Sequence, residues 1–135
     1  RSRSADADGV PSKDEAEAMV KDLTADFTDA IQSGDFSNIY NNASKDFKAT
    51  YTLDQTSNVF KMFVDKKSIV VPILKKAQGM DAEFTTDPYI RQENGLDILV
   101  LNGKFSTKPV PTRFEYEFVK RDGTWQMLKL VVKLT

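Results

Sequence analysis

The spacing of the hydrophobic residues changes at Gly79, and this change limits the folds that the chain can adopt. Before Gly79 the hydrophobic residues recur every three or four positions, which is typical of an α-helix that buries one face. After Gly79 they alternate with polar residues, which is typical of strands that bury one face of a sheet. Helices followed by consecutive strands predict an α+β fold with N-terminal helices packed on a curved antiparallel sheet.

The longest helical pattern begins after Ser12 and ends at Gly34. Ser12 and Glu15 have the spacing of a capping box, and glycine commonly ends a helix because it adopts a left-handed backbone. The apolar positions of this segment are Ala16, Met19, Val20, Leu23, Phe27, Ala30 and Ile31. We therefore predict an amphipathic helix of about twenty residues.

Shorter helices are predicted between residues 35 and 79. The candidate N-caps are Asp35, Ser44, and Thr52 or Asp54. The buried stripe of the helix after Thr52 is expected to consist of Val59, Phe60, Phe63 and Val64, with Met62 beside it. The apolar run 69–74 contains Pro72, which disfavours a central strand. A helix over about residues 71–78 is therefore favoured, with a brief strand as the alternative.

About four strands are predicted after Gly79, over the alternating segments 82–90, 96–105, 113–118 and 125–132. The dipeptides Asn94-Gly95 and Asp122-Gly123 predict two-residue hairpin turns, and Asn102-Gly103 predicts a bulge or turn. The last strand carries apolar residues on both sides, so we expect it to be central in the sheet or wrapped by other segments.

The chain of 135 residues has the length of one domain. Residues 1–11 are small, polar or charged and predict a flexible tether, and residues 12–135 predict a single cone-like α+β domain. The sequence does not begin with Met, so we expect a removed leader, or a lipid anchor upstream of this chain, with an extracytoplasmic location. An artificial cut at the start of the chain is the alternative explanation.

Composition excludes several kinds of chemistry. The chain has no Cys and no His, which excludes disulfides, thiolate nucleophiles and imidazole-based triads or metal sites. The net charge of −1 argues against nucleic-acid binding, and no apolar run reaches the length of a membrane-spanning helix. We expect no cofactor and no metal.

Two segments carry a resemblance to a known family. They are the run from Phe27 through Ala30-Ile31 and Gly34-Asp35-Phe36 to Tyr40, and the closing hairpin Phe114-x-Tyr-x-Phe-x-Lys-Arg-Asp-Gly-x-Trp125. With this order of elements the chain resembles the nuclear transport factor two-like superfamily, in particular its small exported bacterial domains of unknown function. Cystatin-like proteins offer a similar order of elements. The resemblance implies a cone of curved sheet wrapped on the N-terminal helix.

This superfamily includes isomerases, dehydratases, binding domains and interaction modules, so the fold alone does not decide the function. Its enzymes typically place a carboxylate or His base and Tyr donors inside the cone. No motif of this chain aligns cleanly with a catalytic Asp–Tyr pair, and we therefore assign no catalytic residue.

A cone cavity would be lined by the candidate pocket residues Tyr40, Tyr51, Asp97, Phe114, Tyr116 and Phe118. Tyr116, between two phenylalanines in the alternation, could direct its hydroxyl at a ligand, or could be a core residue with its hydroxyl bonded to the backbone or water. Asp97 could be a buried base, or could lie near a solvated strand start.

Our leading hypothesis is a non-enzymatic domain that binds a small apolar ligand or another protein, with a homodimer as one form of that interaction. The alternative is a small isomerase- or dehydratase-like enzyme with an Asp base and Tyr donors. A third hypothesis is a structural accessory domain that binds no ligand.

Overall fold

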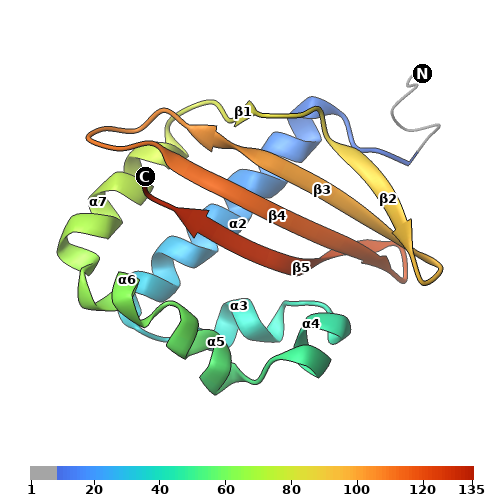
Figure 1. The fold of residues 1–135 in the computed structure, drawn as a ribbon, viewed down its shortest axis with the longest axis horizontal. Helices are drawn as coiled ribbons and strands as arrows, with labels where there is room; N and C mark the ends of the chain where they lie inside the picture. Colours follow the sequence, from blue (N-terminus) through green and yellow to red (C-terminus); the bar gives the residue numbers. More distant parts are fainter. Residues whose placement is uncertain (1–8) are drawn as a thin grey trace.

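Helix α2 (Lys13–Ser33) lies across one face of an antiparallel sheet in the computed structural model, which describes residues 9–135 (Figure 1). The Ser12 side chain accepts a hydrogen bond from the Glu15 backbone at 3.2 Å, and the Glu15 carboxylate accepts one from the Ser12 backbone at 2.9 Å. Gly34 ends the helix with a φ of 79°. The predicted helix and its capping box are therefore confirmed.

Five shorter helices connect α2 to the sheet. They are α3 (Ser37–Asn41), α4 (Lys45–Thr50), α5 (Leu53–Val59), α6 (Lys61–Asp65) and α7 (Lys67–Gln78). The predicted cap of α4 is present, because Ser44 accepts from the Phe47 backbone at 3.1 Å. Of the two candidates for α5, Thr52 is the cap and accepts from the Gln55 backbone at 3.1 Å. Asp35 accepts from the Ser37 backbone at 2.9 Å, although Phe36 occupies the N-cap position of α3.

Two expectations for this region are corrected. The helix after Thr52 breaks at Phe60, so Val59 does not join a buried stripe and is instead 70% exposed. The run around Pro72 is helical, and α7 begins at Lys67 rather than near Val71. Pro72 is exposed and removes one helical hydrogen bond, while the buried side chains of α7 pack this helix against α2.

The sheet has five strands: β1 (Glu83–Phe84), β2 (Tyr89–Glu93), β3 (Leu96–Phe105), β4 (Thr112–Arg121) and β5 (Thr124–Lys133). Their order is β1-β3-β4-β5, and β2 also pairs with β3, on the stretch 96–100. The predicted strand 82–90 is thus two short strands, interrupted just before Tyr89 at Pro88, whose missing N–H cannot join a ladder. The turn residues of both predicted hairpins have positive φ angles, as their dipeptides predicted.

Strand β5 departs from strict alternation because of a β-bulge at Leu128. Phe118 pairs with Met127 and Glu117 pairs with Lys129, which leaves Leu128 without a partner on β4. Met127 therefore shares the inner face with Leu130 instead of lying on the side of Lys129. β5 is also the last strand in the sheet order, so the central position is wrong. Of the other alternative, a strand wrapped by other segments, the structure shows a bridge from Ala43 and a hydrogen bond from Ser44 at Met127.

The core lies between α2 and the inner face of the sheet. Tyr116 is fully buried, and its hydroxyl lies 2.7 Å from the Thr24 hydroxyl of α2. Thr24 donates its own proton to the Val20 carbonyl at 2.8 Å, so Tyr116 is the donor of the pair. Burial raises the pKa of Tyr116 above its ordinary value of 10.0, and the phenol stays protonated. The bond therefore joins helix to sheet at the centre of the core.

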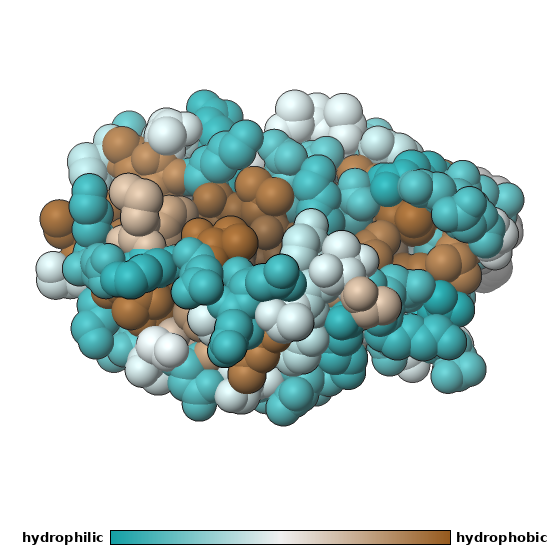
Figure 2. All heavy atoms as spheres, turned by 60° about the horizontal axis from the view of Figure 1, so that its bottom comes forward, coloured by the Kyte–Doolittle hydropathy of each residue, from teal (hydrophilic) through white to brown (hydrophobic). Residues whose placement is uncertain are grey.

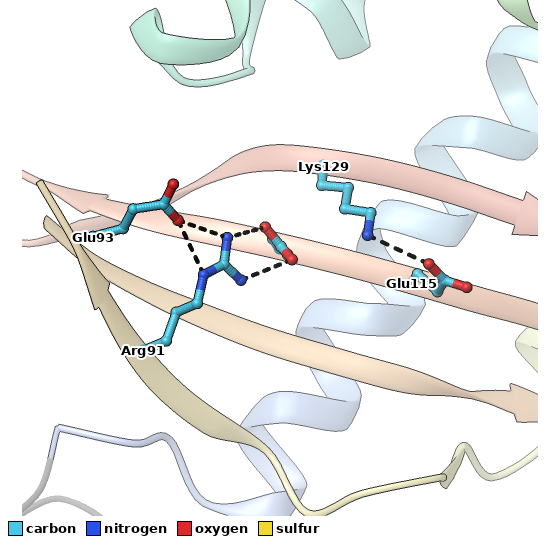
Figure 3. A network of polar contacts seen from close by, with 5 residues as sticks. Arg91, Glu93, Glu115 and Lys129 are labelled. Atoms are coloured by element: carbon cyan, nitrogen blue, oxygen red, sulfur yellow. Dashed lines mark hydrogen bonds and ion pairs between the residues drawn. The ribbon is translucent and has the colours of Figure 1, made fainter.

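The outer face of the sheet has its own small buried cluster, formed by Ile98, Val100 and Val119. Arg91 lies opposite Ile98 in the strand register and forms a two-bond ion pair with Glu117, at 2.9 and 3.0 Å. Figure 3 shows this guanidinium held between carboxylates on the outer face. Glu117 is the main reason that the pKa of Arg91 is raised, so the pair stays charged above these apolar side chains.

The predicted tether falls mostly outside the described residues, which begin at Gly9. Val10, within the predicted tether, packs partly against the core. Among the described helices, none is both long and apolar enough to cross a membrane.

A substitution at Gly103 tests the close contact between β1 and the middle of the sheet. A Cβ at this position would lie 2.3 Å from the Glu83 carbonyl oxygen and 2.9 Å from the Phe114 ring. Gly103→Ala is expected to destabilise the protein by about 2 kcal/mol, because backbone must shift to admit the methyl group. Urea unfolding measures the loss.

Gly79→Ala is the matched control, because the nearest atom to its added Cβ is 3.7 Å away and its φ is negative. Its unfolding free energy should stay within about 0.5 kcal/mol of the parent. Equal losses for both variants would contradict the close packing at Gly103.

Candidate functional site

An apolar groove of about 360 Å³ lies between β5 and the α4–α5 segment. The helical side is lined by Phe47, Tyr51, Thr56, Val59 and Phe60. The strand side is lined by Leu128, Lys129, Leu130 and Val131. Figure 2 turns this side of the molecule forward and shows hydrophobic residues in its left half, and a smaller group in its right half, among hydrophilic ones. The groove is thus an apolar recess with a polar surround.

The helical wall is attached to the sheet at one end of the groove. The Ser44 backbone N–H donates to the Met127 carbonyl at 2.9 Å, and Ala43 forms a parallel bridge with Met127. Asp46, in the first turn of α4, accepts two hydrogen bonds from Arg121 at 2.6 and 3.1 Å. These bonds lower the pKa of Asp46, so the pair is charged at neutral pH.

Aromatic contacts shape the wall itself. The Tyr40 hydroxyl donates to the Tyr51 carbonyl at 2.7 Å, and this bond fixes the chain between α4 and α5. The Phe47 ring lies 6.2 Å from Tyr40 and 5.1 Å from Tyr51, measured between ring centres. Tyr51 is 44% exposed and lines the groove, so part of its side chain remains available there. A rigid aromatic surface of this kind can bind apolar groups without much loss of side-chain entropy.

The structure separates the candidate pocket residues of the sequence analysis. Tyr51 lines the groove, and Tyr40 contacts it through the hydrogen bond from its hydroxyl to the Tyr51 carbonyl. Phe114 and Tyr116 are buried in the core, with ring centres 5.2 Å apart. Asp97 lies near the start of β3, where it accepts a hydrogen bond from Gln92 at 2.7 Å. For Tyr116, the position in the structure is that of a core residue rather than of a ligand contact. For Asp97, it is that of a residue near a strand start rather than of a buried base.

Phe118 lines a second, smaller pocket of about 210 Å³ between α2, α3 and the β4–β5 hairpin. Trp125 and the carboxylates of Asp22 and Asp26 also line it. Partial burial raises the pKa of Asp26, and the neighbouring charges of Asp29 and Asp22 add to this effect. The two carboxylates make the lining of this pocket more acidic than that of the groove beside β5.

Sequence reasoning misses Val59 and the β5 residues of the groove. The helical spacing between Val59 and Phe63 predicts a buried position for Val59, and no local signal contradicts it. The usable signal is in β5, whose residues 127–132 are apolar except Lys129. An edge strand with apolar residues on both sides is unusual, because such edges promote unwanted pairing.

Comparison with protein-family models gives no match to this chain, and comparison with curated proteins gives no significant match.

Removal of the Asp46–Arg121 ion pair tests how the helical wall is attached to the sheet. Because the folded-state pKa of Asp46 is lowered, its carboxylate stabilises the fold above the ordinary carboxyl pKa. This stabilisation is lost as the pH falls through the lowered folded-state pKa. Asp46→Asn should therefore be less stable than the parent at neutral pH, and the difference should disappear in acid.

Denaturant unfolding at several pH values measures this difference. Asp54→Asn is the control, since Asp54 lies in the first turn of α5 and no ion pair of Asp54 is seen among the described residues. A pH-independent difference for Asp46→Asn would contradict a charge-dependent attachment.

Proposed function

We propose that this chain is a non-enzymatic binding module that takes up an apolar ligand or protein segment in the groove between β5 and α4–α5. The observation that carries the proposal is the exposure of apolar side chains along this groove. Val59 is 70% exposed and Tyr51 is 44% exposed, and both line the same recess. Apolar surface that stays in water on the free protein releases that water when a partner covers it.

The volume of the groove supports the same function. A space of about 360 Å³ falls in the range of sites that bind small molecules or a few side chains. Its lining is mostly aromatic and aliphatic, and Lys129 is a polar residue at which a ligand could be oriented. Thr56 also lines the groove, but it is buried and donates its hydroxyl proton to the Thr52 carbonyl. This is the composition expected of a binding site rather than of an acid–base catalyst.

The enzyme hypothesis receives less support from the positions of its residues. The Tyr116 hydroxyl already donates to Thr24 inside the core, and Asp97 lies on β3 near its hairpin to β2. A base and a donor must approach one reacting atom to within about 3 Å, and the positions of Tyr116 and Asp97 provide no such arrangement. The accessory-domain hypothesis predicts that nothing binds the groove, so a probe-binding experiment separates it from ours.

The α+β order and curved sheet are compatible with the nuclear transport factor two-like resemblance. That resemblance, the extracytoplasmic location and the upstream lipid anchor remain predictions from the sequence. Our proposal does not depend on them, because it rests on the groove.

The groove can be tested with the fluorescent apolar probe anilinonaphthalene sulfonate. The native protein should increase its fluorescence, and Val59→Glu should weaken probe binding about tenfold, because the variant places a charge in the apolar recess. Fluorescence titration of the folded proteins provides both values.

Ile69→Glu is the matched control. Ile69 is 64% exposed and lies on α7 rather than on the groove. Its probe binding should equal that of the parent. Equal weakening by both variants, or no binding by the parent protein, would contradict the proposed function.

A further inference from the structure

The outer edge of β5 is open beside the groove. Ala43 and Ser44 cover this edge at Met127. Over residues 128–133, no segment of the described chain pairs with it. Alternate backbone N–H and C=O groups of an edge strand point away from the sheet, and here they point toward the side where the groove lies.

The occupant of the groove therefore meets two kinds of surface. The helical wall offers Phe47, Tyr51 and Val59, while the strand offers unpaired backbone donors and acceptors. A small apolar molecule would cover the helical wall but would leave the backbone N–H and C=O groups of the strand without hydrogen-bond partners. An extended polypeptide satisfies both, because its backbone continues the sheet and alternate side chains enter the recess.

An extended ligand alternates residues that enter the recess with residues that face the other way. The charges beside this edge indicate the chemistry of the second set. On the outer face, Arg113 and Lys133 lie directly across from each other on β4 and β5, and Lys104 on β3 lies between Arg113 and Glu83 of β1. The like charges of Arg113 and Lys133, next to the β5 edge, repel each other. Glu115 contacts both Lys129 and Lys133, at 3.4 and 3.5 Å, and Figure 3 shows the first of these contacts. One carboxylate thus serves two ammonium groups, which leaves a positive excess at the edge.

We propose that the natural ligand of this groove is an extended peptide segment that pairs with β5, with apolar residues toward the helical wall and acidic residues toward Lys129 and Lys133. This inference rests on the proposed function and specifies its ligand. A second copy of this chain paired through β5 would bring the lysines of both copies to one interface and would concentrate positive charge there. The charges therefore favour a separate acidic partner.

The first experiment uses a capped peptide of alternating Val and Glu residues and, as its control, the same peptide with Lys in place of Glu. Calorimetry or fluorescence anisotropy should show the acidic peptide binding at least about tenfold more tightly than the basic one. The double variant Lys129→Glu/Lys133→Glu should reverse this preference. Equal affinities of the two peptides would overturn the assignment of charge.

The second experiment tests backbone pairing. Two versions of the acidic peptide carry N-methyl groups on alternate residues, in opposite phase. Only one phase removes the N–H groups that face β5, so one version should lose at least about tenfold in affinity while the other keeps it. Equal binding of both versions would overturn strand pairing.

The failure of this inference can be distinguished from failure of the proposed function. If Val59→Glu blocks the fluorescent probe but the acidic peptide does not bind, the groove is a small-ligand site and the peptide inference is wrong. If sedimentation shows a dimer that the peptide does not dissociate and that Val59→Glu does, the occupant is a second copy and the inference is also wrong.

Discussion

The packing of α2 against the inner face of the sheet is the interaction on which the rest of the structure depends. Complete burial of a large apolar side chain contributes roughly 1.5–3 kcal/mol, whereas an exposed ion pair contributes about 0–1 kcal/mol. Phe27 and Ile31 of α2 and Phe114 and Leu101 of the sheet are all fully or almost fully buried. The Tyr116–Thr24 hydrogen bond gives the buried phenol the partner that it needs at the centre of this layer. Because a hydrogen bond is directional, it also restricts how the helix lies on the sheet.

This core leaves the candidate site at the periphery. The α3–α5 segment lies below β5 in Figure 1 and is attached to it near Met127. Beyond that attachment, the groove separates the helical wall from the strand. The bulge at Leu128 contributes to the geometry, because it brings Met127 and Leu130 to the inner face and leaves Lys129 and Val131 on the outer face. The site therefore exists because the final strand of the sheet is only partly covered by its own chain.

Local signals predicted much of the fold. The capping box at Ser12 and the turn at Asp122-Gly123 depend on residues within a few positions of each other, so one sequence suffices to find them. The edge position of β5 and the exposure of Val59 depend on which distant segments meet, and spacing carries no such information. The candidate pocket was only partly predicted for the same reason. The alternation of aromatic residues identified the strand of Tyr116 but did not show that its hydroxyl would form a hydrogen bond with Thr24.

Amide hydrogen exchange of the ligand-free protein, followed residue by residue by NMR, tests the open edge of β5 most directly. We expect slow exchange throughout the central region of β4, where both neighbours provide hydrogen bonds. Within residues 128–133, the amides bonded to β4 should be protected, and the outward-facing amides between them should exchange much faster. Uniformly slow exchange along β5 would contradict an uncovered strand edge in the free chain.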